Sequence, residues 1–172
     1  MKKGISIPAL FILLFLVSFK YSDNWVTYKS IEGHYSMSFP GTPTESESSQ
    51  KSDNGNSMTL HLATYSHDTN VAYMSDWVNI GADYPANKTI TQILEDSRDA
   101  AVKNINATSV TTKLNLSGNP FVEYSFKSKD FVGKGRFYII NKYQYGIIAI
   151  YGSKMEISSD ADTFLQSFRH ID

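Results

Sequence analysis

Apolar and polar residues alternate with a period of two along much of the chain. In the segment 35–39, YSMSF, the residues Tyr35, Met37 and Phe39 fall on one face of an extended chain, and two serines fall on the other. This alternation is typical of a strand that is buried on one side. The pattern predicts strands over 25–30, 35–39, 58–66, 71–80, 109–116, 121–128, 135–141 and 145–152. The last two are the most apolar, so we expect them at the centre of the sheet.

A period close to 3.6 residues replaces this alternation in two places. The first helix is predicted to begin near Thr89, which can form a capping box with Gln92, and to run to about Asn106. Its apolar stripe consists of Ile93, Leu94, Ala101 and Ile105. A second helix is predicted near residue 160, with a capping box between Ser159 and Asp162 and an apolar stripe of Phe164, Leu165 and Phe168.

These elements define the expected fold class. Strands joined by short turns form antiparallel pairs, and an amphipathic helix has to bury its apolar stripe. The sequence therefore predicts an α+β fold, in which an antiparallel sheet of about seven or eight strands is packed by two amphipathic helices. The polar segment 44–57 is expected to be a mobile loop or the outer part of a long hairpin that turns at Asn54-Gly55. Gly133-Lys134-Gly135 is expected to be a hairpin turn.

The first 22 residues have the pattern of an export signal. Two lysines follow Met1, and residues 4–19 form an uncharged apolar run. Sixteen helical residues span roughly 24 Å, less than the roughly 30 Å of a bilayer core. We therefore expect residues 1–22 to be a secretory signal peptide or an N-terminal membrane tether, and residues 23–172 to form a single domain that is periplasmic or extracellular.

Composition excludes several classes of function. The chain has no cysteine, which excludes disulfides, thiol catalysis, thiolate metal sites and a lipid-modified cysteine. Without residues 1–22 it would carry 13 Lys and Arg against 17 Asp and Glu. Because phosphate binding needs clustered basic residues, we expect no nucleic-acid partner.

The segment ILEDSRDAAVKNI, residues 93–105, looks most like a charged active site, but helical geometry argues against that interpretation. Its acidic residues project opposite the apolar stripe and therefore face water, an environment that does not favour acid–base catalysis. Arg98 lies at the border, where its stem can cover the sheet while its guanidinium reaches a carboxylate or carbonyl. The four histidines, at positions 34, 61, 67 and 170, are too dispersed to predict a metal site, and no cofactor is expected.

Aromatic residues provide a second candidate surface. Tyr65, Tyr73, Trp77 and Tyr84 precede the first predicted helix. Such a group either packs in the core or lines a groove for a small molecule or peptide. The candidate ligand or partner surface therefore consists of Arg98, Tyr73, Trp77 and Tyr84.

The order of the segments resembles a known family. EGHYSMSFPGTP near the start and ADTFLQSF near the end carry most of the resemblance. Together with the intervening segments they are similar to small exported bacterial proteins with a PsbP-like α/β/α sandwich. That fold is shared by the extrinsic PsbP subunit of photosystem II and a Ran-binding nuclear-transport factor. The resemblance covers about residues 32–168 and brings no catalytic motif.

Three functional hypotheses follow. The first is a non-catalytic exported domain that binds another envelope protein or assists its assembly. The second is a carrier of a small ligand or lipid that uses an aromatic groove near Trp77. The third is a hydrolase with a dispersed site, which would require a buried histidine close to a carboxylate or a serine. The first is preferred because the sequence contains no catalytic motif.

Overall fold

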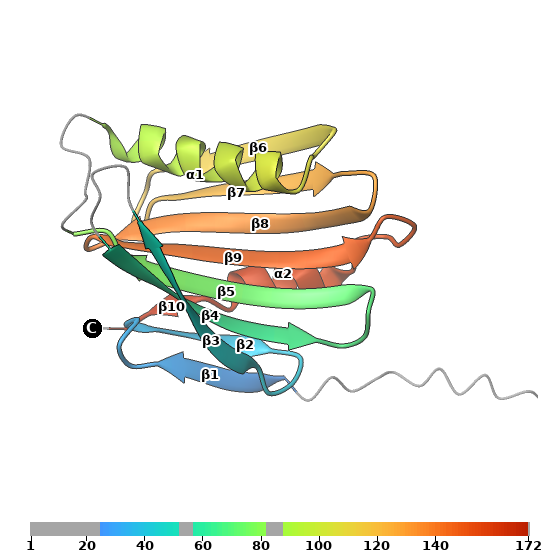
Figure 1. The fold of residues 1–172 in the computed structure, drawn as a ribbon, viewed down its shortest axis with the longest axis horizontal. Coiled ribbons are helices and arrows are strands. Elements are labelled where there is room, and N and C mark those ends of the chain that lie inside the picture. Colours follow the sequence, from blue (N-terminus) through green and yellow to red (C-terminus); the bar gives the residue numbers. More distant parts are fainter. Residues whose placement is uncertain (1–24, 52–56, 82–87, 172) are drawn as a thin grey trace, which may run out of the picture.

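The computed structural model describes residues 25–51, 57–81 and 88–171, and these residues form ten strands and two helices (Figure 1). The elements, in chain order, are β1 (Val26–Ser30), β2 (Tyr35–Phe39), β3 (Thr44–Lys51), β4 (Ser57–Ser66), β5 (Val71–Asn79), α1 (Ile90–Asn104), β6 (Ser109–Asn115), β7 (Phe121–Lys127), β8 (Phe131–Ile140), β9 (Tyr143–Gly152), α2 (Ser159–Gln166) and β10 (Arg169–His170). All eight predicted strands are present. The two additional strands are β3 and the short β10.

The strands form two antiparallel sheets. The larger has seven strands in the order β3-β4-β5-β9-β8-β7-β6, and the smaller has three in the order β1-β2-β10. β9 is the central strand of the larger sheet and β8 is its neighbour, which confirms the central position predicted for the most apolar segments. β10 pairs with β2, so the end of the chain is joined to a strand near its beginning.

Strand β3 resolves the two interpretations of the polar segment 44–57. Residues Thr44–Lys51 pair in antiparallel register with β4, so they form the outer strand of a hairpin. The segment lacks apolar alternation because β3 is the edge of the sheet and most of its side chains are exposed. The predicted turn at Asn54-Gly55 lies outside the described residues.

The prediction of a hairpin turn at Gly133-Lys134-Gly135 is wrong. These residues lie inside β8. A Cβ atom at Gly135 would approach the ring of Tyr124 to 2.4 Å, and one at Gly133 would approach the ring of Phe126 to 2.7 Å. The glycines therefore allow two aromatic rings of β7 to lie on the neighbouring strand.

Helix α1 begins as predicted. The Thr89 hydroxyl accepts a hydrogen bond from the Gln92 N–H (3.2 Å), and the Gln92 side chain accepts one from the Thr89 N–H (2.8 Å). The helix ends at Asn104, two residues early, because Asn106 takes a positive φ of 51° and terminates it. Ile93 and Leu94 are buried against the sheet, whereas Ala101 and Ile105 are half-buried.

Helix α2 begins one residue earlier than the predicted capping box implies. The Ser158 hydroxyl, not that of Ser159, caps it by accepting a hydrogen bond from the Asp160 N–H (3.1 Å). Asp162 instead forms an ion pair with Lys134 at 2.8 Å. Of the predicted stripe, Phe164, Leu165 and Phe168 are all buried.

The two faces of the seven-stranded sheet are covered differently. We call the face that carries Tyr73 and Trp77 the inner face; it packs against α2 and the three-stranded sheet. The buried side of β2, made of Tyr35, Met37 and Phe39, fills the space between the sheets. Helix α1 packs on the opposite, outer face over β7 and β8. The α+β prediction is thus correct, and a second small sheet shares one face with a helix.

The predicted export segment, residues 1–22, lies outside the described residues, as does Tyr84. Within the residues that are described, no helix has the length and apolar character needed to cross a membrane.

Candidate functional site

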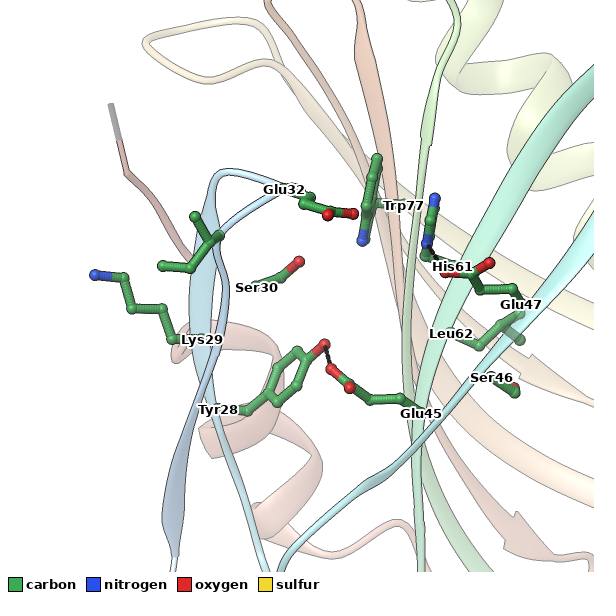
Figure 2. A pocket seen from close by; sticks show the side chains of 11 residues that line it. Tyr28, Lys29, Ser30, Glu32, Glu45, Ser46, Glu47, His61, Leu62 and Trp77 are labelled. Carbon is green, nitrogen blue, oxygen red and sulfur yellow. Dashed lines mark hydrogen bonds and ion pairs between the residues drawn. The ribbon is translucent and has the colours of Figure 1, made fainter.

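A pocket of about 290 Å³ lies between the β1–β2 hairpin and the β3–β4–β5 side of the larger sheet (Figure 2). Three segments form it. β1 and the turn after it supply residues 28–32, β3 supplies residues 45–47, and β4 and β5 supply His61, Leu62 and Trp77. The volume is near the lower end of the roughly 300–1,000 Å³ of small-molecule pockets, and suits a single side chain or small group.

Strand register explains why acidic residues face this pocket. In the sequence TESES, Glu45 and Glu47 are two positions apart, so both side chains project from the inner face. Glu47 is opposite His61, and His61 is opposite Trp77. These three residues therefore form a row across β3, β4 and β5, although they lie far apart in the sequence.

The histidine and the tryptophan of this row are stacked. Their ring centroids are 3.9 Å apart and the ring planes differ by 2°. His61 Nδ1 lies 3.1 Å from a carboxylate oxygen of Glu47, whose side chain is 67% exposed. The stack covers one face of the indole, so the pocket does not have that face available for a ligand.

Gly33 shapes the same edge of the pocket. A Cβ atom at this position would lie 2.7 Å from the Ser30 hydroxyl and 2.8 Å from Trp77 Nε1. The Gly33 N–H donates to the Ser30 hydroxyl at 3.1 Å, which holds the turn after β1 in place. Glycine is therefore required here because the backbone passes close to the indole.

Tyr28 and Glu45 join the two sides of the pocket. The Tyr28 hydroxyl on β1 donates to Glu45 on β3 at 2.5 Å. Burial, together with the neighbouring carboxylate, raises the pKa of Tyr28 to about 12. Tyr28 therefore remains a neutral hydrogen-bond donor at physiological pH.

The pocket has an excess of negative charge. Glu32, Glu45 and Glu47 line it, and Lys29 is the one lysine or arginine among its lining residues, all of which belong to the described part of the chain. Figure 2 shows the Lys29 ammonium group pointing away from the space into which the carboxylates of Glu32 and Glu45 are directed. This arrangement favours a cationic group in the pocket.

The indole N–H of Trp77 is a donor without an acceptor. Trp77 is 8% exposed and lines the pocket, and in Figure 2 its nitrogen is directed into it. Among residues 25–51, 57–81 and 88–171, no hydrogen-bond acceptor for this N–H is present. Because the N–H faces the pocket and forms no bond within these residues, it is available to a ligand.

The structure separates two of the sequence-predicted site residues. Tyr73 and Trp77 share the inner face of β5, but Tyr73 lines a second pocket of about 210 Å³ with Tyr151 and Met155. The Tyr35 hydroxyl, hydrogen bonded to Ser75 at 2.8 Å, and Phe164, packed on Tyr73, fill the space between them. The aromatic residues thus line two small pockets in place of one groove.

Arg98 lies on the outer face, away from both pockets. Its guanidinium forms an ion pair with Asp99 at 2.7 Å and approaches the Thr112 hydroxyl on β6 at 3.4 Å. The side chain is 17% exposed. Arg98 therefore joins α1 to β6, in the border position that helical geometry predicts.

The hydrolase hypothesis depends on the surroundings of the histidines. His61 has the carboxylate partner that the hydrolase hypothesis requires, but in the described parts of the chain no hydroxyl is hydrogen bonded to it. The same residues contain no group of three or more metal-ligating side chains.

Asp76 is a further carboxylate with unusual surroundings. It lies next to Trp77 in β5, so its side chain projects from the outer face, over Gly146 of β9. Burial raises the pKa of Asp76 to about 6, although a backbone hydrogen bond from Gly146 lowers it in part. Asp76 does not contribute to the pocket.

Comparison with known proteins identifies the architecture. No family model matches the chain, and no curated protein matches it. Among solved structures, the chain is similar to the solution structure of PsbP from the cyanobacterium Synechocystis sp. PCC 6803, with a TM-score of 0.55. The fold is PsbP-like. The match covers 85% of this chain and 92% of that chain at 8% identity, which shows the fold alone.

The PsbP-like fold confirms the resemblance drawn from the sequence segments. Of the residues that line the pocket between the sheets, Trp77 was predicted as part of a site and the others were not. The alternation of glutamates in TESES and the glycine in EGHY are the two local signals that point to it. These signals indicate a site only after the structure shows Glu47 opposite His61 and Gly33 close to Trp77.

Proposed function

We propose that this chain is a non-catalytic exported domain that binds another protein at the cell envelope through the pocket between its two sheets. The observation that carries the proposal is the combination of three carboxylates with the unpartnered indole N–H of Trp77. The carboxylates offer hydrogen-bond acceptors to a ligand and the indole N–H offers a donor. Neither group is a nucleophile activated by a neighbouring base. Binding needs such complementary polar groups, whereas hydrolysis needs an activated nucleophile.

The position of the pocket favours a protein partner over a free metabolite. Its rim is open, and Ile31, in the turn after β1, is 68% exposed at its edge. Exposed apolar residues beside a polar pocket are suited to contact with a second protein surface. The export segment predicted at residues 1–22 supports an envelope location for this interaction.

Site-specific photocrosslinking in cells tests this proposal. A photoreactive residue at Ile31 is expected to give one discrete adduct with an envelope protein. The matched control is Phe131, which is 44% exposed on the outer face at the start of β8. Purified domain added to a membrane-protein extract should compete for the Ile31 adduct, and the Glu45→Gln and Glu47→Gln domain, which has lost two carboxylates of the pocket, should compete less well. Identical adducts from both positions, or none from Ile31, would contradict the proposal.

A small-ligand carrier is a second candidate, and the pocket beside Tyr73 favours it. That pocket is lined by mainly apolar groups, including Val71, Tyr151 and Met155. Its volume of about 210 Å³ accommodates a small apolar molecule but not a lipid chain. Release of such a molecule from the natively purified protein, detected by mass spectrometry and abolished by Tyr73→Ala with the fold intact, would support this function.

A further inference from the structure

The pocket between the two sheets contains groups that select one kind of ligand. This inference rests on the proposed function and adds the chemistry that the partner must present. We infer that the pocket receives the charged side chain of a lysine or arginine of the partner protein, with the carbonyl of a neighbouring peptide bond as acceptor for Trp77 Nε1–H.

The carboxylates are the reason for proposing a cationic side chain as the ligand. Glu32, Glu45 and Glu47 approach the pocket from both sides, and the positive charge of Lys29 is directed away from it (Figure 2). Glu45 has a hydrogen bond from Tyr28, and Glu47 has one contact with His61. A carboxylate can accept about four hydrogen bonds, so each retains free acceptor positions for an ammonium or guanidinium group.

The indole N–H is the reason for proposing a residue within a peptide as the ligand, and not a free cation. Trp77 Nε1–H is a donor, so neither a cation nor a second donor can satisfy it. A simple amine would satisfy the carboxylates and leave the indole unpaired. A free amino acid would bring its own carboxylate close to three others, which is electrostatically unfavourable. A basic residue within a peptide offers a cation and a neutral carbonyl together.

The stacking of His61 on Trp77 makes the recognition depend on hydrogen bonds. Methylated ammonium groups bind to the faces of aromatic rings, and one face of this indole is covered at a centroid distance of 3.9 Å. The pocket should therefore discriminate between a cation that carries N–H groups and one that does not. Trimethyl-lysine should bind more weakly than lysine, although the two have the same charge.

The test uses the indole N–H of Trp77 as a reporter in ¹H–¹⁵N NMR spectra of the full domain. The chain has two tryptophans, so Trp25→Phe assigns the signal. The probes are acetylated, amidated Gly-Lys-Gly and Gly-Arg-Gly peptides, with acetyl-lysine and trimethyl-lysine versions as controls. The lysine and arginine peptides should shift the Trp77 signal with a Kd of about 1 mM, which is reasonable for one side chain. The acetyl-lysine peptide should bind about tenfold more weakly.

Charge-neutralising variants connect the response to the pocket. The double variant Glu45→Gln and Glu47→Gln should weaken binding of the lysine peptide by about tenfold, and raised salt should weaken binding to the wild type. The matched control is Asp130→Asn, in the exposed turn between β7 and β8, which should leave the Kd unchanged. Dispersed amide spectra of all three proteins establish that each is folded.

Several outcomes would overturn the inference. The Trp77 signal could fail to respond to the basic peptides, or it could respond equally to the acetyl-lysine peptide. n-Butylammonium could bind as tightly as the peptides, which would assign the pocket to a free amine. Calcium alone could shift the signal, which would assign the carboxylates to a metal ion. In any of these cases a persistent Ile31 adduct would leave the protein-binding function intact, whereas loss of the adduct alone would remove that function.

Discussion

Carboxylates occur at two places beside the inner face of the seven-stranded sheet, and their surroundings differ. Glu123 on β7 is paired with Arg136 on β8, and the two side chains are 25% and 12% exposed. The Arg136 guanidinium also donates to the Tyr138 hydroxyl and the Leu165 carbonyl, and lies 4.4 Å from the ring centre of Phe121. The guanidinium of this charge pair therefore has a carboxylate, a hydroxyl, a carbonyl and an aromatic ring as partners.

The carboxylates of the pocket have no such environment. Glu32, Glu45 and Glu47 are exposed, and the contacts of the last two are with Tyr28 and His61, not with an arginine or lysine. The difference separates two roles for the same chemical group. A carboxylate surrounded by partners stabilises the fold, whereas one with free acceptor positions at a pocket is available for a ligand.

The largest effect on stability is expected from breaking the half-buried pair of Glu123 and Arg136. Arg136→Ala should lower the free energy of unfolding by about 3 kcal/mol, because it leaves Glu123 without its cation and removes the contacts with Phe121 and Leu165. Urea denaturation measures this loss. The control is Lys113→Ala, an exposed residue opposite Glu123 on β6, for which a change within about 0.5 kcal/mol is expected. A loss below about 1 kcal/mol for Arg136→Ala would show that the pair is not a stabilising element.

Asp76 is a half-buried carboxylate without a cation, so removal of its charge should stabilise the protein. The pKa of Asp76 is raised from 3.8 to about 6, so the folded protein binds the proton more tightly than the unfolded chain does. The stability that this group contributes is therefore present below about pH 4 and is lost as the pH rises to about 6. At neutral pH, Asp76→Asn should raise the free energy of unfolding by about 2 kcal/mol.

Urea denaturation of wild type and Asp76→Asn across this pH range checks the sign. The difference between the two proteins should be constant above about pH 7 and should decrease as the pH falls through 6 towards 4. A difference that stays constant over the whole range would show that Asp76 titrates normally.

Arg98 tests whether a paired arginine at the border of the outer face has a role in binding. Arg98→Ala should lower the free energy of unfolding by about 1 kcal/mol, because its contacts with Asp99 and Thr112 are only partly shielded from water. The response of the Trp77 N–H to the lysine peptide should not change. An altered peptide Kd would return Arg98 to the binding surface that the sequence suggested.

The smallest effect on stability is expected in the pocket itself. Glu47→Gln should change the free energy of unfolding by no more than about 0.5 kcal/mol, since the Glu47 side chain is exposed and such a contact with histidine contributes little. The contrast with Arg136→Ala is the critical comparison. If Glu47→Gln destabilised the protein as much as Arg136→Ala, both groups of carboxylates would be structural.

Much of the fold could be predicted because its signals are local. The alternation in YSMSF placed Tyr35, Met37 and Phe39 on the buried side of β2. The capping box of Thr89 and Gln92 marked the start of α1 within one residue. Local signals failed where an element depends on its neighbours. β3 is a strand because β4 pairs with it, and Gly133 and Gly135 leave room for aromatic rings of β7.

The candidate site was predictable only in part. The sequence identified Trp77, but grouped it with Tyr73 because the two are close along β5. Side chains of β2 and α2 fill the space between them, and no pattern within β5 indicates this. Glu45, Glu47 and His61 were missed because strand pairing, not sequence distance, brings them to Trp77.

By itself, the sequence determined the strands, the helices, the faces they bury and the absence of thiol chemistry, because periodicity and residue type act over a few residues. Only the tertiary structure decided which faces meet. Pairing of β3 with β4, and closure of the β1–β2 hairpin over the sheet, placed three carboxylates and one indole N–H at the same pocket. Such a constellation depends on the register of distant strands, which is fixed by the packing of the whole core.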